Sequence, residues 1–220
     1  MDSRARYEHF LEAVETVVEA KLAELHTAEP CTIVSWDAAK QTAVLQPVNK
    51  TLVRKPDGTT EWASKPQIPD VKIHYPGGGG LAVTHPLSEG DEVLAVMSSR
   101  SPDVWQQNGG EQQIIDTRTH DLSNAFCFPG FRSDKNALPN VSENSKQIRT
   151  NDDQTNIDFK DGQITVQAHA AKVIVATDTV TVEKGDMKIV VSSSRVDLGG
   201  TGGQAVMTEG GPSTKVFAVI

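Results

Sequence analysis

Residues 157–200 read IDFKDGQITVQAHAAKVIVATDTVTVEKGDMKIVVSSSRVDLGG, and this stretch decides the fold class. Its apolar residues fall in short pairs with a period of two, and turn signals such as Asp161-Gly162 and Lys184-Gly185-Asp186 separate the pairs. Alternation of this kind with β-branched side chains predicts short β-strands. The predicted core residues of these strands are Ile164, Val166, Val173, Val175, Val180, Val182, Ile189, Val191, Val196 and Leu198.

This segment is too thin to close a core of its own. Phe159 is its only Phe, Tyr or Trp before Phe217, and it contains no proline between Ile157 and Gly211. Apolar pairs that recur every roughly 7 to 9 residues are typical of β-helices and solenoids, in which stacked rungs bury a narrow aliphatic interior. We therefore predict a β-helical shaft over residues 157–220, with three intertwined chains supplying the apolar area that one chain lacks.

The segment before the shaft has a different pattern. Residues 28–100 contain several short apolar runs, such as CTIVSWD at 31–37, and turn signals such as Pro56-Asp57-Gly58 separate them. Five or so short strands at this spacing predict a small β-barrel such as an OB-fold. Residues 101–156 are punctuated by Gly, Pro, Ser and Asn, and we expect an irregular linker that braces the chains.

Residues 1–27 carry the one helical pattern. Between Tyr7 and His26, apolar residues recur at three- and four-residue spacing with Glu and Lys between them. This pattern predicts an amphipathic helix, whose apolar stripe needs a partner. The body of the same chain, a neighbouring copy and another protein all remain open as that partner.

Composition excludes several classes of function. The 220 residues hold 21 Lys and Arg against 29 Asp and Glu, a formal net charge of −8, so we expect no nucleic-acid binding. Cys31 and Cys127 form no CxxC and have no His partner at zinc-ligand spacing, which predicts buried free thiols. No stretch approaches the roughly 18 apolar residues of a membrane span, and the charged N-terminus lacks a secretory signal. We expect a soluble protein made in the cytoplasm.

Four motifs carry a resemblance to a known family. HYPGGGGL at 74–81, PLSEGDEVL at 86–94, RTHDLSNA at 118–125 and PGF at 129–131 occur in this order, with Trp105 between the second and the third. Together they resemble the N-terminal domain of the central spike proteins of contractile phage tail baseplates, over about residues 28–132. RVDLGG at 195–200 resembles the closing β-helix of that family more loosely.

The resemblance implies a non-enzymatic, mechanical protein of the virion. An N-terminal OB-fold would dock a homotrimer beneath the tail hub protein, and a triple-stranded β-helix would pierce the host outer membrane when the sheath contracts. The residues that we assign to the hub or trimer interface are Phe10, Val14, Val17, Trp36, Trp105 and Leu122.

The resemblance also raises the question of the tip. Relatives often end in an apex where a His-X-His pair from each chain holds iron, but this sequence has no His after His169, so we expect no tip iron and no other cofactor. The tip is then either blunt or capped by a separate protein. The possible attachment residues are Val216, Phe217, Val219 and Ile220.

Other functional interpretations fit the sequence less well. Gly77–Gly80 lacks the Lys-Ser or Lys-Thr of a P-loop and is interpreted as a flexible loop between strands. Ser123 lies beside His120 and Asp121 without a G-x-S-x-G elbow, and the histidines have no zinc spacing, so we expect no catalytic or metal site. The alternatives are an OB-fold module that binds oligosaccharide or single-stranded nucleic acid, and the adaptor part of a baseplate hydrolase.

Overall fold

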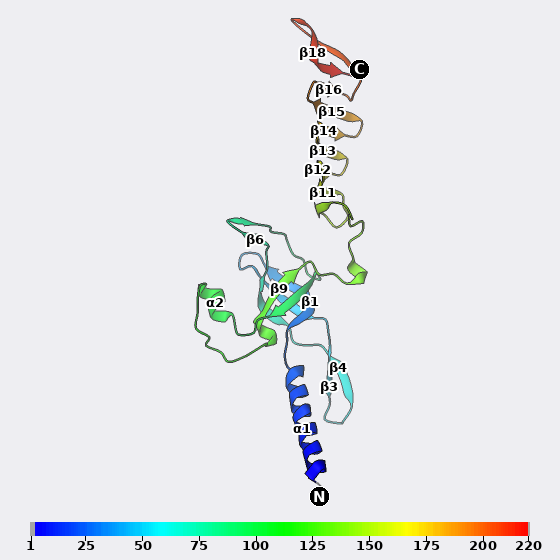
Figure 1. The fold of residues 1–220 in the computed structure, drawn as a ribbon. Helices are drawn as coiled ribbons and strands as arrows, with labels where there is room; N and C mark the ends of the chain where they lie inside the picture. The colour runs from blue at the N-terminus through cyan, green and yellow to red at the C-terminus, as the bar shows by residue number, and fades with distance from the viewer. Residues whose placement is uncertain (1–2, 220) are drawn as a thin grey trace. The chain divides into compact units, whose positions relative to one another are not determined.

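The computed structural model describes residues 3–219, with side chains described from residue 9 onward. The chain folds as two compact units, Met1–Asn136 and Ala137–Ile220 (Figure 1). The protein is mainly β, as predicted, with one long N-terminal helix, α1 (Ser3–Ala23). The helix that the sequence placed at residues 7–26 is confirmed, although it begins and ends a few residues earlier.

Unit 1 contains a closed barrel of five strands. In order around the barrel these are β1 (Ala28–Asp37), β2 (Thr42–Pro47), β5 (Ile68–Ile73), β9 (Ala125–Pro129) and β8 (Glu92–Met97). All neighbouring strands are antiparallel except β5 and β9, which pair in parallel. The predicted small barrel is therefore present.

The predicted end of the barrel at residue 100 is wrong. Strand β9 closes the barrel, yet it lies inside the 101–156 segment that we expected to be irregular. The sequence pattern did not indicate β9, because the strand has only five residues and follows a region rich in turn signals. It also pairs with strands that lie far away along the chain. Lys72 on β5, for example, pairs with Phe126 on β9.

Strict alternation builds the barrel core. The strand β8 reads EVLAVM, and its second, fourth and sixth residues are buried while the others are only partly covered. The buried cluster consists of Cys31, Ile33, Ala43, Leu45, Ile68, Val71, Ile73, Leu87, Val93, Ala95, Met97, Ala125 and Cys127. Both cysteines are free thiols in this core, as the sequence predicted. Burial raises the pKa of the Cys31 thiol to about 11 and the pKa of the Cys127 thiol to about 12.

Short elements decorate the barrel. They are the hairpin β3 (Thr51–Arg54) with β4 (Thr60–Ala63), the hairpin β6 (Gly77–Gly78) with β7 (Leu81–Ala82), the two-turn helix α2 (Asp103–Asn108), and the 3₁₀ turns η1 (Leu122–Asn124) and η2 (Asp134–Asn136). The glycine run is not the flexible loop that we predicted but a tight hairpin. Its two turn residues, Gly79 and Gly80, have φ of +60° and +86°, which glycine adopts without steric cost.

Unit 2 is one nine-stranded sheet. Its strands are β10 (Lys146–Arg149), β11 (Thr155–Lys160), β12 (Gln163–Ala168), β13 (Ala171–Ala176), β14 (Thr179–Lys184), β15 (Met187–Ser192), β16 (Val196–Leu198), β17 (Gln204–Thr208) and β18 (Gly211–Ala218). From β10 to β16, each strand pairs antiparallel with the next. The sheet begins at Lys146, so the predicted start of this region at residue 157 is also wrong.

The last two strands break the simple order. β18 pairs in parallel with β16, and β17 then forms the edge of the sheet. The glycine run at 199–203 makes this return possible, because a Cβ at Gly203 would lie 2.3 Å from the carbonyl carbon of Ala218. These glycines thus permit the close approach of the β18 backbone.

Candidate functional site: an exposed aliphatic face

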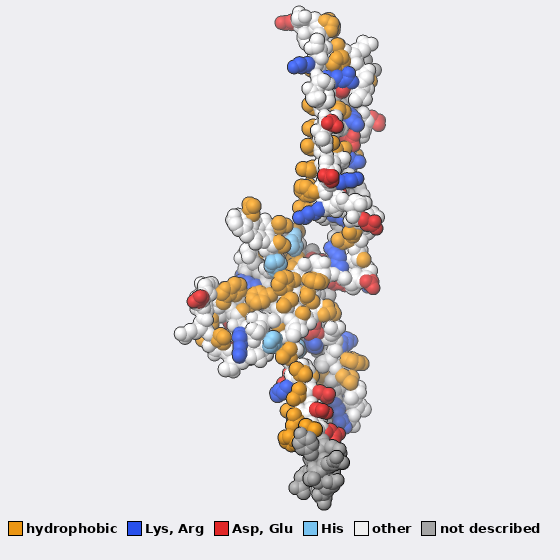
Figure 2. Space-filling model, viewed as in Figure 1, with side chains coloured by type: hydrophobic (Ala, Val, Ile, Leu, Met, Phe, Trp, Pro, Cys, Tyr) orange, Lys and Arg blue, Asp and Glu red, His pale blue; other side chains and the backbone are white. Residues whose placement is uncertain are grey.

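The strand register of unit 2 gathers the predicted shaft residues on one face of the sheet. One ladder of cross-strand partners runs Val166, Val173, Val182, Ile189 and Leu198. A second ladder runs beside it through Ile164, Val175, Val180, Val191 and Val196. We call these ten residues the aliphatic face. Figure 2 shows hydrophobic side chains in a line along this part of the chain.

The aliphatic face is not buried in the single chain. Each of its residues except the less exposed Val196 retains between 37% and 46% of its surface in contact with solvent. The predicted grouping of these side chains is therefore observed, whereas their burial in a core is not. Among the described residues of unit 2, Val190 is the only buried hydrophobic side chain, and it points to the opposite face. An apolar face of this length without a covering layer marks an interaction surface.

The opposite face holds a partly polar column. Val190 lies between its cross-strand partners Thr181 and Asp197, both of which are also buried. Nε of Arg195 donates to Oδ2 of Asp197 at 3.1 Å, and the guanidinium of Arg195 stacks 5.0 Å from the ring centre of Phe217. These contacts hold the end of β18 against the sheet.

Asp158 occupies the same column near the other end of the sheet. It accepts hydrogen bonds from the hydroxyl of Ser145 at 2.6 Å and from the amide of Gln147 at 2.9 Å. These hydrogen bonds to the charged form lower the pKa of Asp158 below its ordinary value. They tie the segment before β11 to the sheet.

The proposed tip residues do not form a free tail. Val216 and Phe217 lie within β18, between the strands β16 and β17, and are partly buried. Val219 follows the strand and is 50% exposed, whereas Ile220 lies outside the described residues. The free hydrogen-bonding edge at this end of the sheet belongs to β17 instead.

A hollow lined by aromatic side chains lies on the outside of the barrel. Its floor is the parallel pair of β5 and β9, which presents Lys72, His74, Phe126 and Phe128. The imidazole of His74 packs on Phe128 with ring centres 4.9 Å apart, and Trp105 on α2 meets Phe126 edge-on at 5.9 Å. Of the predicted interface residues, Trp105 lines this hollow, and the alternation of Phe126 and Phe128 is the sequence signal for the two phenylalanines.

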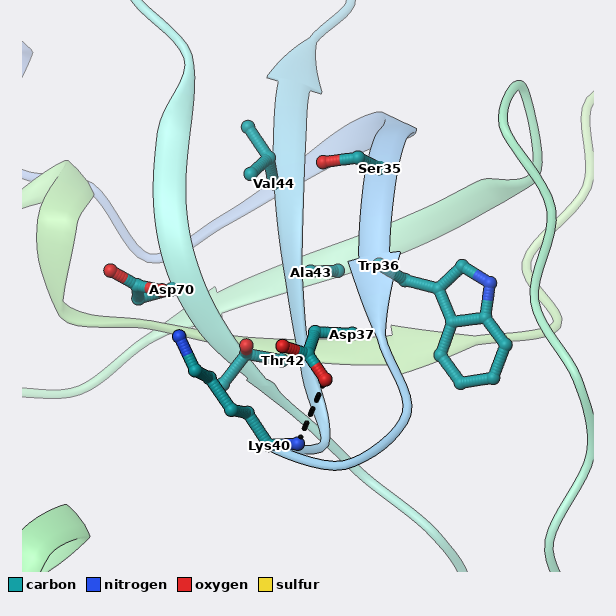
Figure 3. Close-up of a pocket in the computed structure, with 8 residues that line it drawn as sticks. All are labelled: Ser35, Trp36, Asp37, Lys40, Thr42, Ala43, Val44 and Asp70. Atoms are coloured by element: carbon teal, nitrogen blue, oxygen red, sulfur yellow. Dashed lines mark hydrogen bonds between the residues drawn. The ribbon is translucent and has the colours of Figure 1, made fainter.

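Trp36 and Leu122, the other two barrel residues that we assigned to an interface, pack against the barrel core. Trp36 also borders a small polar hollow beside the turn between β1 and β2 (Figure 3). In that turn, one carboxylate oxygen of Asp37 accepts hydrogen bonds from the backbone amides of Ala39 and Lys40. The structure thus separates Trp36 and Leu122 from the aromatic hollow and gives both a structural contact.

The motif RTHDLSNA forms an ordered brace. Asp121 caps η1 by accepting a hydrogen bond from the backbone amide of Ser123, and Arg118 donates to the hydroxyl of Ser123 at 2.6 Å. The hydroxyl of Ser123 donates in turn to the carboxylate of Asp121. These hydrogen bonds lower the pKa of Asp121. The backbone carbonyl of His120 accepts from the amide of His26 at 3.0 Å, so the brace also holds the segment that follows α1.

The predicted interface residues of α1 are exposed. Phe10, Val14 and Val17 have exposed fractions of 63%, 42% and 62%. The barrel of the same unit therefore leaves them uncovered.

The described part of the chain contains neither a membrane-spanning helix nor a cluster of metal ligands. None of its helices is long and apolar enough to cross a membrane. Among residues 3–219, no group of three His, Cys, Asp or Glu side chains comes together as a metal site.

The fold and the site define a mainly β protein with a closed five-stranded barrel and an unpartnered aliphatic sheet. Residues 29–130 match the family described as the phage protein Gp138 N-terminal domain. The resemblance that the sequence motifs carried is thereby confirmed for the barrel domain. It gives the chain a structural role in a phage tail or baseplate, as a component of the virion. No curated protein matches the chain.

Proposed function

We propose that the protein is the central spike of a contractile phage tail baseplate, and that it works as a homotrimer. The observation that carries the proposal is the aliphatic face, which runs across every strand from β12 to β16 and stays open to solvent in one chain. Three copies of this sheet, wound around a common axis with their aliphatic faces inward, form a triple-stranded β-helix.

The exposed fractions of the side chains on the aliphatic face set the free energy that trimerisation can add. Full burial of a Val, Leu or Ile side chain stabilises a protein by about 1.5–3 kcal/mol. About two fifths of each side chain of the aliphatic face is still exposed, so trimerisation adds roughly 0.6–1.2 kcal/mol per residue. Over the whole face this gives on the order of 10 kcal/mol per chain, which is comparable with the entire stability of an ordinary domain.

The mechanical role follows from this topology. Three sheets that pack by their aliphatic faces cannot separate without exposing all of these faces to water at once, so unfolding is slow and force from the contracting sheath reaches the tip without buckling the shaft. We propose that the barrel is an OB-fold that docks beneath the tail hub, and that the shaft pierces the host outer membrane. The proposal includes no catalytic step, no cofactor and no nucleic acid.

The aromatic hollow supports a second candidate function, the binding of an oligosaccharide. Stacking rings beside polar side chains are the usual lining of a sugar site, and the amides of Gln41 and Gln106 join the rings here. Saturable binding of outer-membrane oligosaccharide that is lost in a Trp105→Ala variant would favour this function. Its absence would leave the hollow as a protein contact.

The experiment that tests the spike is the solution mass by light scattering, with resistance to heat and detergent recorded on the same sample. A trimer has three times the chain mass of 23.7 kDa, roughly 71 kDa. We expect a Val175→Asp variant to lose the trimer, because it places a charge on the aliphatic face. Gln163→Asp, exposed on the opposite face, is the matched control and stays trimeric. A monomeric wild-type protein would overturn the proposal.

A further inference from the structure

The helix α1 carries an apolar stripe that the rest of its own chain does not cover. Its members are Phe10, Leu11, Val14, Val17, Val18 and Leu22, with Leu25 just beyond the helix, and each of them is between 42% and 63% exposed. Figure 2 shows hydrophobic side chains gathered along one side of this helix. Most of the stability of a helix in a protein comes from the packing of its apolar face rather than from helix propensity. We therefore expect α1 to pack against a partner other than the barrel of its own chain.

The width of the stripe indicates how many helices meet. At about 100° per residue, the stripe spans roughly 140° of the helix surface. The seam of a two-stranded coiled coil is narrower, because it uses only the a and d positions. A stripe this wide is covered on both sides when three or more helices surround one axis.

The two flanks of the stripe have different chemistry. On one side lie the glutamates Glu15 and Glu19, whereas the other side presents the small side chains of Ala13 and Ala20. Lys21 lies within the stripe, between Phe10 and Val14, and its Nζ pairs at 2.9 Å with Glu24, which follows the helix on the alanine side. The alanine flank thus carries one acid, and that acid is already paired.

This asymmetry selects a parallel arrangement. When helices run parallel around an axis, each flank faces the opposite flank of its neighbour, so the glutamates of one helix meet the alanines of the next. In an antiparallel pair, like flanks meet, and the glutamates of two chains would oppose each other at a cost. A neighbouring copy in parallel orientation is therefore the occupant that the charges favour.

We propose that the α1 helices of three copies pack against one another as a parallel three-helix coiled coil. The proposal rests on the homotrimer proposed above and gives it a second trimerisation element, separate from the aliphatic face. The helix stripe is then an internal contact of the spike, and contact with the hub falls to the surface of the barrel.

Disulfide cross-linking of the full chain tests the proposal. Val18→Cys places a thiol on the stripe, and Thr16→Cys places one on the far side of the same helix turn, where Thr16 is also exposed. The native thiols of Cys31 and Cys127 are buried and do not interfere under native conditions. We expect mild oxidation to give a cross-linked dimer band for most of the Val18→Cys protein, and at least ~10-fold less for Thr16→Cys.

A second variant, Leu11→Cys, distinguishes the two orientations, because an antiparallel overlap of the stripe would still bring Val18 opposite Val17 of the partner. In a parallel bundle the Leu11→Cys thiols lie level, whereas an antiparallel partner would place them about thirteen residues apart along the axis, or roughly 20 Å, which is too far for a disulfide. A trimeric mass without the Val18→Cys cross-link overturns the coiled coil and leaves the spike proposal standing. A monomeric mass overturns both. Equal cross-linking of Val18→Cys and Thr16→Cys would show random collision and also refute the coiled coil.

Discussion

Truncating one side chain of the aliphatic face gives the sharpest quantitative test of the shaft. Val182 lies in the middle of the first ladder, between Val173 and Ile189, and is 46% exposed in the single chain. Val182→Ala removes two carbon atoms, each worth about 0.8 kcal/mol when fully buried. The expected loss is therefore about 1.6 kcal/mol per chain and about 5 kcal/mol for a trimer that buries three copies.

A Val→Ala change elsewhere in unit 2 provides the control. Val141 is 67% exposed and lies outside the strands, so Val141→Ala removes the same atoms from a position that stays in water. Its expected cost is below about 0.5 kcal/mol, as for other surface substitutions. The two variants have the same composition and differ only in the position of the change.

The assay is the unfolding rate of the trimer in guanidinium chloride, since intertwined chains unfold too slowly for an equilibrium measurement. We expect Val182→Ala to unfold at least ~10-fold faster than wild type, because each factor of ten corresponds to about 1.4 kcal/mol. Val141→Ala should stay within about twofold. Equal rates for the two variants would refute the reasoning, since they would mean that the aliphatic face remains in water in the assembly.

Three further predictions concern other parts of the chain. Burial holds the thiols of Cys31 and Cys127 protonated, so neither should react with a thiol reagent at pH 8 in the folded protein. Both should react once guanidinium is added, and labelling of the native protein would contradict the barrel core. Gly203→Ala should destabilise the sheet end by ~1–3 kcal/mol through its clash with the β18 backbone, whereas Gly210→Ala, with nothing within 4 Å, should melt like wild type. Asp158 has a lowered pKa when folded, so its contribution to stability is present above the unfolded pKa of about 3.9 and is lost as pH falls through the folded value. Wild type should therefore lose more stability than Asp158→Asn in acid unfolding between about pH 5 and 2, and parallel curves would exclude this role.

The strands of the barrel show what a local sequence pattern can predict and what it cannot. The apolar run EVLAVM at residues 92–97 is a local signal for a strand, and its alternation matches the buried positions because side chains alternate between the two faces of any strand. The run AFCFP at 125–129 has the same alternation, yet its place in the barrel depends on pairing with residues more than fifty positions earlier. No local signal specifies such a partner.

For the candidate sites too, the sequence indicated some features and only the structure showed the others. Sequence motifs were sufficient to indicate the phage family, but they did not show that His74, Phe126 and Phe128 share one hollow with Trp105. These residues come from three separate segments, which only the closed barrel brings together. The free edge of β17 was equally hidden, because it depends on the parallel return of β18 to β16.

The sequence by itself determined the strands from β11 to β16 and the side chains that they present together, because a period of two assigns each side chain to one face of a strand. Only the tertiary structure decided whether that face is covered. The register aligns Val166, Val173, Val182, Ile189 and Leu198 in one ladder, and no other element of unit 2 packs over them. Burial depends on what lies opposite a side chain in space, and the period of a sequence carries no information about that.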